Sequence, residues 1–456
     1  MKRPVTVIGG GLAGCEAAFQ LAARGFSVAL LEMRPVVTGP AHHTDRLAEL
    51  VCSNSLKSDD PTTATGVLKR ELETLASLVL ACGRATAVPA GGALAVDRDE
   101  FAALVTSTVS RMPGVTVLRE EAASIPAGDV VIATGPLTSA ALEPALCSLI
   151  GDSRLAFFDA AAPVVDAATI DHSLVFAASR YDKGGGADYL NCPMDRAQYE
   201  AFVDALLDAR RVVVKDFEAA EQFQACRPIE EIARSGRDAP RFGAMKPVGL
   251  TDPLTGRRPW AVVQLRPENA GGTAYNLVGF QTNLTFAEQD RVFHMIPGLA
   301  AAEFARHGVM HRNTFIDAPR LLTADLALRR EPRVRIAGQL AGTEGYLEAA
   351  GTGLVAALGL AAASAGRPRV TLPRETVLGA LLAYATDPAT EPYQPMHVNY
   401  GLMPNLSPPV RGKQDRYAAY AARATLALDA WTRARGDLAL SRVRQTLARA
   451  EKVCTA

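Results

Sequence analysis

The chain has 456 residues, of which 48% are hydrophobic and 21% are charged, and its 48 basic residues balance its 48 acidic residues. This is the composition of a globular protein, and the length predicts two or three domains. A net charge of zero excludes a uniformly basic nucleic-acid-binding protein, so any contact with RNA must come from a local basic surface.

Seven cysteines without a CxxC pair argue against a disulfide framework and against a zinc cluster. No apolar stretch approaches the roughly 20 uncharged residues that span a membrane. The N-terminus "MKRPVTVIGG" leads directly into a predicted strand and leaves no room for a signal peptide. We therefore expect a cytoplasmic protein with no membrane contact and no metal.

The first predicted elements, over residues 5–32, form a dinucleotide-binding unit. A short apolar run at 5–8 predicts a buried strand, and the helical spacing of Ala17, Ala18, Leu21 and Ala22 predicts a helix. The sequence "SVALLE" predicts a second strand that ends at Glu32, where a carboxylate accepts ribose hydroxyls.

The turn between the first strand and the helix carries the pattern Gly9-x-Gly11-x-x-Gly14. Here Gly9 permits the tight turn, Gly11 lets a pyrophosphate approach the backbone, and Gly14 allows the helix to pack closely on the strand. The helix N-terminus offers unpaired N–H groups to the phosphates. The predicted cofactor-binding residues of this unit are Gly9, Gly10, Gly11, Leu12, Ala13, Gly14 and Glu32.

The next elements favour FAD over NAD as the dinucleotide. Helices are predicted near 66–82 and over 97–110, and "AGDVVIATGPL" predicts a buried strand that ends at Thr134 and Gly135. Residues 333–363 predict a late strand, a turn at Gly338 and a long helix that includes Tyr346. Large flavoproteins close the FAD site with such a late unit, so we expect an inserted domain before it.

Between these two parts the sequence predicts helices near 195–210 and 216–225 and strands at "PWAVVQLR" and "YNLVGFQTNL". We therefore predict an α/β fold, in which a Rossmann-like FAD-binding domain with a doubly wound parallel sheet carries an inserted α+β domain. The predicted parts are residues 1–160, 161–325 (the insertion), 326–405 (the return) and 406–456.

The last part is predicted to be a helical tail with ten basic and four acidic residues between 411 and 452. Contact with phosphates and a merely solvated basic helix face explain this charge equally well.

Several long stretches resemble the TrmFO family of folate- and FAD-dependent tRNA uracil-5-methyltransferases, which are related to the GidA-type flavoproteins. They include "VIGGGLAGCEAA", "PAHHTDRLAELVCSNSLKS", "FQACRPIEEIARSG", "AGQLAGTEGYLEAAGTG" and "YQPMHVNYGLMP". The resemblance extends from residue 5 to about residue 404. It implies that 5,10-methylenetetrahydrofolate donates a one-carbon unit, that reduced FAD carries it to C5 of the T-loop uridine (position 54) of tRNA, and that NADH or NADPH reduces the flavin.

The family has two functional cysteines, and both positions are matched, by Cys52 and Cys226. A thiolate that adds to C6 of uracil makes C5 nucleophilic, and a thiolate needs positive surroundings. Because Arg227 follows Cys226, we expect Cys226 to be the nucleophile. Cys52, in a polar Ser/Asn-rich loop, is expected to assist at the flavin or in removing the C5 proton. Exchanged roles are the alternative.

Other polar residues are candidates with less defined roles. Glu344 and Glu348 are four residues apart near the flavin-closing turn, where either is a candidate general base or a structural carboxylate. Tyr346 between them is a candidate for stacking on flavin or base. The candidates for contacts with substrate are His42, His43, Arg227, Lys246, His311 and Arg312. Gln339 stands where many flavoproteins carry an aspartate.

Three other functions are consistent with parts of the sequence. The same chemistry on a uridine of 23S ribosomal RNA uses the same pocket residues. An NAD(P)H-dependent flavin oxidoreductase without RNA needs only the dinucleotide site. A non-catalytic protein with the flavoprotein fold needs neither cysteine.

Overall fold

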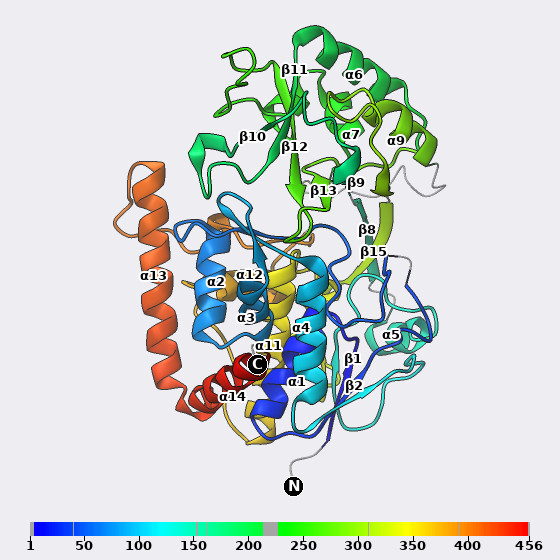
Figure 1. Cartoon of the computed structure of the whole chain (residues 1–456). Helices are drawn as coiled ribbons and strands as arrows, with labels where there is room; N and C mark the ends of the chain where they lie inside the picture. The colour runs from blue at the N-terminus through cyan, green and yellow to red at the C-terminus, as the bar shows by residue number, and fades with distance from the viewer. Residues whose placement is uncertain are drawn as a thin grey trace.

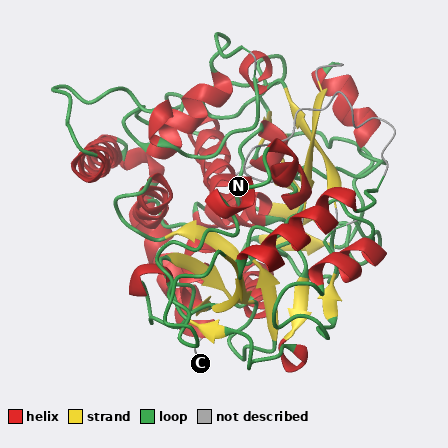
Figure 2. Cartoon of the chain, turned by 90° about the horizontal axis from the view of Figure 1, so that it is seen from above, coloured by secondary structure: helices red, strands yellow, loops and turns green. Residues whose placement is uncertain are grey.

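The computed structural model describes residues 4–454 except 40, 152–153, 161, 213–226, 309 and 392. The described chain forms two bodies, one above the other in Figure 1. The lower body contains both ends of the chain, and the upper body contains the strands from β9 to β14. Seen from above, helices flank the strands (Figure 2).

A five-stranded parallel sheet forms the centre of the lower body. Its order is β16-β7-β1-β2-β6, with β1 at Val5–Ile8, β2 at Val28–Leu31, β6 at Val115–Leu118, β7 at Asp129–Ile132 and β16 at Val334–Ile336. Strand β1 pairs in parallel with both β2 and β7. The strand order therefore reverses between β1 and β7, and ligands of such sheets bind at this switch point. The predicted α/β fold with a parallel sheet is confirmed.

Two helices rich in small residues pack against each other on this sheet. They are α1 (Leu12–Ala23) and α11 (Tyr346–Ser364). All twelve residues of α1 are buried. A Cβ atom added at Gly353 of α11 would lie 2.1 Å from the carbonyl oxygen of Ala13, so the glycine sets the spacing between the helices.

Gly353→Ala should destabilise the protein by about 3 kcal/mol, because the added methyl group overlaps a backbone atom in a packed core. Urea denaturation of the variant and the wild type measures this difference. Gly436→Ala is the control, since a Cβ at Gly436 would meet no atom within 4 Å. Equal stability of Gly353→Ala and wild type would contradict this packing.

Further elements complete the lower body around the sheet. They are β3 (Ser55–Ser58), α2 (Ala64–Thr74), α3 (Leu78–Ala85), β4 (Ala87–Val88), β5 (Ala93–Val96), α4 (Arg98–Arg111), α5 (Glu143–Ile150), α10 (Ala318–Leu321) and α12 (Val377–Thr386). The structure confirms the helix predicted over 97–110, which begins after the capping residue Asp97.

The single helix predicted near 66–82 is wrong, because α2 and α3 are separated at residues 75–77. Ala76 has a φ of 60°, and Ser77 caps α3 by accepting a hydrogen bond from Leu80 N. The buried carboxylate of Glu16 accepts hydrogen bonds from Val79 N at 2.9 Å and from Ser77 Oγ at 2.7 Å. A partner on α1, remote in sequence, thus stabilises the start of a new helix.

The upper body is built on a six-stranded sheet of order β10-β11-β12-β13-β9-β14, in which the neighbouring strands are antiparallel. The strands are β9 (Val164–Asp166), β10 (Phe176–Ala177), β11 (Leu190–Met194), β12 (Ala261–Pro267), β13 (Ala274–Leu277) and β14 (Phe304–Arg306), and the helices are α6 (Arg196–Asp208), α7 (Ile229–Ser235), α8 (Ala239–Phe242) and α9 (Phe286–Phe293). The body has its own core, with Phe202, Phe280 and Phe293. The mixed α+β character expected of the insertion is confirmed.

Of the elements predicted for this body, one strand is shorter than predicted and one helix is not described. The strand predicted at "YNLVGFQTNL" ends at Leu277, and the chain turns at Gly279, whose φ is 78°. The helix predicted near 216–225 lies outside the described residues.

The chain passes between the two bodies along the antiparallel strands β8 (Arg154–Ala160) and β15 (Met310–Ile316). Phe315, Ile316, Ala318 and Leu322 belong to the core of the lower body. The predicted end of the insertion, at residue 325, therefore comes after the chain has already entered the lower body. The exact domain limits stay predictions.

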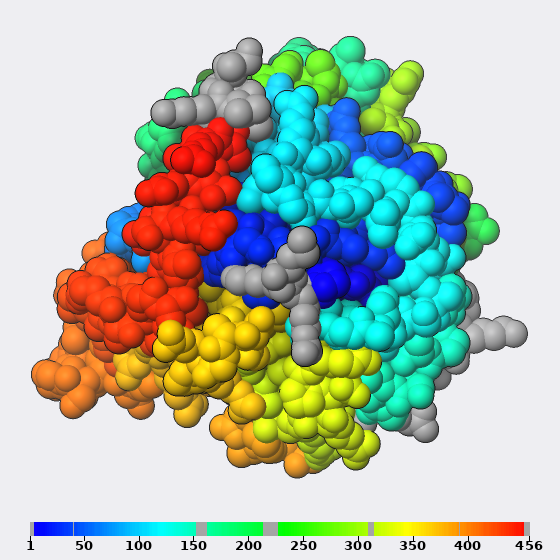
Figure 3. Space-filling view, turned by 90° about the horizontal axis from the view of Figure 1, so that it is seen from below, coloured from blue at the N-terminus to red at the C-terminus, as the bar shows by residue number. Residues whose placement is uncertain are grey.

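The C-terminal segment forms α13 (Lys413–Ala434) and α14 (Leu440–Cys454). Helix α13 packs on α2, and α14 packs on α1 and α4. Seen from below, the C-terminal helices lie beside the N-terminal part of the chain, red next to blue in Figure 3.

One helix in the described part of the chain, α11, is long and apolar enough to cross a membrane, although no such stretch was expected. Of the apolar stretch within α11, 78% is buried inside the protein, so its apolar composition is explained by its place as the central core helix.

Candidate functional site

A cavity of about 650 Å³ lies at the carboxyl ends of β1 and β7, where the strand order reverses. The glycine-rich turn, Glu32, Thr134, Gly135 and the segment from Gly338 to Ala349 line it, and the loop at Cys52 forms another wall. Gln281 is the lining residue from the upper body. The cavity thus joins the two predicted parts of the dinucleotide domain and reaches the insertion.

The glycine-rich turn has the geometry of a phosphate site. Gly9 has a φ of 101°, and a Cβ there would lie 2.6 Å from the carbonyl oxygen of Ala133 on the neighbouring strand. A Cβ at Gly14 would lie 1.8 Å from the carbonyl oxygen of Gly9. At Gly11 it would meet no atom within 4 Å. Gly11 is also the N-cap of α1 and provides no side-chain hydrogen bond. The first N–H groups of α1 are therefore available to an anion.

Glu32 stands at the end of β2 and contacts this turn. Its Oε2 accepts a hydrogen bond from Gly10 N at 3.0 Å, and its Oε1 accepts two from Arg34. A carboxylate has about four acceptor positions, so Oε2 keeps one for a ribose hydroxyl. Burial alone would raise the pKa of Glu32, but the hydrogen bonds and the charge of Arg34 hold this pKa below its ordinary value.

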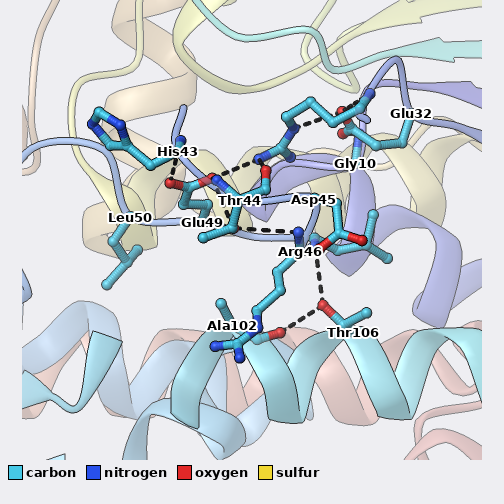
Figure 4. Close-up of polar contacts among 12 residues, drawn as sticks. Gly10, Glu32, His43, Thr44, Asp45, Arg46, Glu49, Leu50, Ala102 and Thr106 are labelled. Atoms are coloured by element: carbon cyan, nitrogen blue, oxygen red, sulfur yellow. Dashed lines mark hydrogen bonds and ion pairs between the residues drawn. The ribbon is translucent and has the colours of Figure 1, made fainter. Parts of the chain in front are cut away.

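Arg34 links Glu32 to the loop that carries the two histidines. Its guanidinium group is 2.8 Å from Glu32 Oε1 and 2.8 Å from Glu49 Oε2, and all three side chains are almost fully buried. Glu49 accepts hydrogen bonds from the backbone N–H groups of His43 and Thr44 (Figure 4). The imidazole of His43 points away from this network, and His43 is exposed.

Arg34→Met should cost about 3–5 kcal/mol of stability at neutral pH, because two buried carboxylates lose their cation. The deficit should shrink on acidification, since protonation then relieves the unpaired carboxylates. Acidification also lowers the stability of the wild type, which reduces the deficit further. The stabilisation that comes from the lowered pKa of Glu32 is complete above the ordinary carboxyl pKa and is lost as the pH falls through the lowered pKa.

Urea denaturation at neutral and mildly acidic pH measures both effects. Arg46→Met is the matched control, because its pair with Asp99 is exposed and should contribute less than about 1 kcal/mol. A pH-independent deficit in Arg34→Met would contradict the buried ion-pair network.

The Cys52 loop is fixed to the first turn of α11 by Tyr346. The phenol oxygen of Tyr346 accepts hydrogen bonds from Cys52 N at 2.9 Å and Ser53 N at 3.2 Å. Burial raises the pKa of Tyr346, so the phenol stays protonated. Cys52 is half-buried and lines the cavity. The thiol and the glycine-rich turn therefore border the same space.

The two candidate carboxylates occupy different surroundings. Glu348 is 1% exposed and pairs with Lys57 Nζ at 2.7 Å. Glu344 accepts a hydrogen bond from Gln339 Nε2 at 2.6 Å. His397 also lines the cavity, and burial and the nearby Lys57 lower its pKa. Lys57 and His397 are charged or titratable groups at this wall that were not predicted as site residues.

Among the predicted substrate residues whose side chains the structure describes, His42 is the one that lines the cavity; burial and Arg34 lower its pKa. Lys246 is exposed and lies on the upper body, where its carbonyl oxygen accepts a hydrogen bond from Arg180. His311 and Arg312 pair with Asp159 and Phe158 in the strands that connect the bodies. Nothing further is described of their side chains, and their contact with substrate stays a prediction.

Cys226 lies outside the described residues, and the chain resumes at Arg227. The guanidinium group of Arg227 donates a hydrogen bond to the carbonyl oxygen of Glu231. Two residues further, Ile229 N donates a hydrogen bond of 2.8 Å to the carbonyl oxygen of the cavity-lining Gln281. The described chain after Cys226 thus begins next to a residue that lines the cavity.

Several residues at the site were missed in the sequence. They are Arg34, Lys57, Arg98, Gln281, Arg306 and His397. Only Arg34 had a local signal, since it follows Glu32 by two positions at the end of a predicted strand. Within the described residues, no group of three or more His, Cys, Asp or Glu side chains is arranged to hold a metal ion.

Comparison with known proteins agrees with this architecture. The family model of glucose inhibited division protein A matches residues 4–368. The crystal structure of GidA from Aquifex aeolicus (form II crystal) superimposes with a TM-score of 0.69 at 17% identity, covering 98% of this chain and 76% of that chain. This likeness shows the shared fold.

Closer relatives share the sequence over nearly its whole length. The methylenetetrahydrofolate–tRNA-(uracil-5-)-methyltransferase TrmFO of Geobacter sulfurreducens is 54% identical over 432 residues, which cover 94% of this chain and 99% of the relative. The protein of the same name from Symbiobacterium thermophilum is 54% identical over 431 residues, which cover 94% and 96%. The chain belongs to the glucose inhibited division protein A family and, within it, to the TrmFO family.

Proposed function

We propose that this protein is a methylenetetrahydrofolate–tRNA-(uracil-5-)-methyltransferase, which transfers a one-carbon unit to C5 of a uridine in tRNA. Full-length identity above 50% to proteins of that name supports the reaction. The structural observation that carries it is the shared cavity, which is lined both by the half-buried Cys52 and by the glycine-rich turn.

The residues of the cavity fit FAD. Gly11 leaves space at the N-terminus of α1 for the pyrophosphate, and Glu32 retains an acceptor position for the ribose. Thr134, Gly135, Gly338 and Tyr346 also line the cavity, and they are proposed to hold the remainder of the cofactor. When bound, reduced FAD would supply the electron pair that converts a methylene unit to a methyl group. We propose NADH or NADPH as its reductant.

The protein side chains are proposed to activate and deprotonate the uracil. A thiolate at Cys226 adds to C6, which makes C5 nucleophilic toward the one-carbon unit, and it leaves again when C5 loses its proton. The hydrogen bond from Ile229 N to the carbonyl oxygen of Gln281 supports this role, because it joins the described chain that follows Cys226 to a residue of the cavity lining. Cys52 is proposed to act at the same cavity, at the flavin or on the C5 proton.

Of the two glutamates, Glu344 is the better candidate for the base. Glu348 is paired with Lys57 and also lies 3.4 Å from Val398 N, so its contacts are those of a structural carboxylate. Glu344 accepts a hydrogen bond from the neutral side chain of Gln339, whereas Glu348 is paired with a cation. His42, which lines the cavity near Arg34, is proposed to contact bound ligand rather than RNA phosphate.

We propose that the substrate uridine lies in the T-loop, at position 54, and that the T-arm of tRNA is the partner, bound in the cytoplasm. The uridine must leave its stack to reach the cavity, which costs a few kcal/mol. The ten basic residues between 411 and 452 are candidates for compensating contacts with RNA phosphates.

Carbon transfer tests the proposal. Purified protein with FAD, NAD(P)H and labelled methylenetetrahydrofolate should label a T-arm minihelix, and replacement of the T-loop uridine by cytidine should abolish the label. Label in ribosomal RNA fragments instead, or flavin turnover without label in any RNA, would contradict the assignment.

A further inference from the structure

The backbone of the Cys52 loop is surrounded by three arginines at the contact between the two bodies. Arg98 is the first residue of α4 in the lower body, whereas Arg266 lies on β12 and Arg306 ends β14 in the upper body. In Figure 1 the lower end of β12 faces the lower body. No local sequence pattern connects the three positions.

Each guanidinium group contacts the loop directly. Arg306 Nη2 is 3.1 Å and Arg98 Nη2 is 3.4 Å from the carbonyl oxygen of Cys52. Arg266 donates to Ser53 Oγ at 2.7 Å and to Asn54 Oδ1 at 2.9 Å. Because the sulfur belongs to the same residue as the bonded carbonyl oxygen, the charges of Arg98 and Arg306 lie within about 8 Å of it.

The positive charge of the cluster is only partly compensated. Glu268 pairs with Arg98 at 2.6 Å and is the carboxylate that the described contacts place among the three arginines. Arg266 is 6% exposed, and the Nε of Arg306 is buried without a hydrogen-bond partner. Burial lowers the pKa of Arg266 and of Arg306, a sign that the cluster would gain from an additional anion.

Tyr346 is a further titratable group that touches the loop; it stays protonated and receives hydrogen bonds from the Cys52 and Ser53 N–H groups. The Lys57–Glu348 pair further along the wall is internally neutral. The charges that the described contacts place around the Cys52 loop are therefore three cations and one anion.

We infer that Arg98, Arg266 and Arg306 hold Cys52 as a thiolate in the resting protein and act as positioning residues for it. The inference deepens the proposed function, since a thiolate at Cys52 is the form that bonds carbon or takes a proton. It also ties the reactivity of Cys52 to the docking of the upper body, which supplies two of the three cations.

The ionisation of Cys52 tests the inference in the FAD-loaded protein without RNA or folate, so its outcome is independent of the transfer assay. The ultraviolet thiolate absorbance of each protein, minus that of its Cys52→Ser counterpart, is titrated with pH. Iodoacetamide alkylation gives a second measurement, in which sulfur bonds carbon and iodide leaves. It is followed on the tryptic peptide 47–57, whose single cysteine is Cys52.

The titration midpoint should lie at least one pH unit below the value of about 8.5 of an ordinary thiol, which makes the ratio of thiolate to thiol at pH 7 at least about tenfold higher. Arg306→Gln should raise the midpoint, and Arg306→Lys should restore it. Arg306 is preferred to Arg266 because Arg266 is more deeply buried and its loss endangers folding.

Glu268→Gln separates charge from scaffolding. If the cluster acts by charge, this variant should lower the midpoint, opposite to Arg306→Gln. If the arginines only hold the loop in shape, both variants should shift the midpoint in the same direction. That result, or a wild-type midpoint near the ordinary thiol value, would overturn the inference.

Discussion

Gly11→Ala should give a folded protein that has lost its flavin. The position has no protein atom within 4 Å of an added Cβ, and its backbone is in an extended conformation that alanine adopts without strain. The methyl group would instead occupy the space through which a pyrophosphate approaches the first N–H groups of α1. We expect FAD affinity to fall at least 100-fold, which corresponds to about 3 kcal/mol.

The flavin content of the purified variant and a fluorescence titration with FAD measure this effect, and circular dichroism and urea denaturation check the fold. Gly14→Ala is the contrasting variant. Its Cβ would lie 1.8 Å from the carbonyl oxygen of Gly9, so we expect loss of stability and not selective loss of flavin. Normal flavin binding by Gly11→Ala would place the cofactor elsewhere.

Cys226→Ala and Cys52→Ala should each lower methyl transfer by at least about four orders of magnitude, since removal of a supporting catalytic residue costs about that much and removal of a nucleophile up to about six. They should differ with tRNA that contains 5-fluorouracil, because fluorine at C5 cannot leave as a proton does. The covalent adduct between sulfur and C6 should therefore persist with Cys52→Ala and be absent with Cys226→Ala.

Denaturing gel electrophoresis of the protein–RNA adduct provides the measurement. Cys147→Ala is the control, since Cys147 is a half-exposed cysteine on α5 that is not among the residues that line the cavity. An adduct that depends on Cys52 and not on Cys226 would exchange the two roles. Dependence on neither would rule out thiol addition to the base.

The dinucleotide site illustrates what local sequence encodes. The spacing Gly9-x-Gly11-x-x-Gly14 specifies a backbone path, and Asp97 specifies where α4 begins, because each effect acts within a few residues. The parallel strands followed from their apolar runs for the same reason. The break between α2 and α3 was missed because its partner, Glu16, lies about sixty residues earlier in the chain.

The surroundings of Cys52 could not be inferred in this way. Its N–H group meets Tyr346, 294 positions away in sequence, and its carbonyl oxygen meets Arg306, 254 positions away. The fold brings these groups together through the return of the chain to the lower body and the docking of the upper one. The sequence by itself determined the nucleotide turn, the central sheet and the existence of an insertion, since these depend on short-range conformational preference and on the burial of apolar runs. Only the tertiary structure decided which charges face the thiol, because electrostatic interactions depend on distance in space and not on separation along the chain.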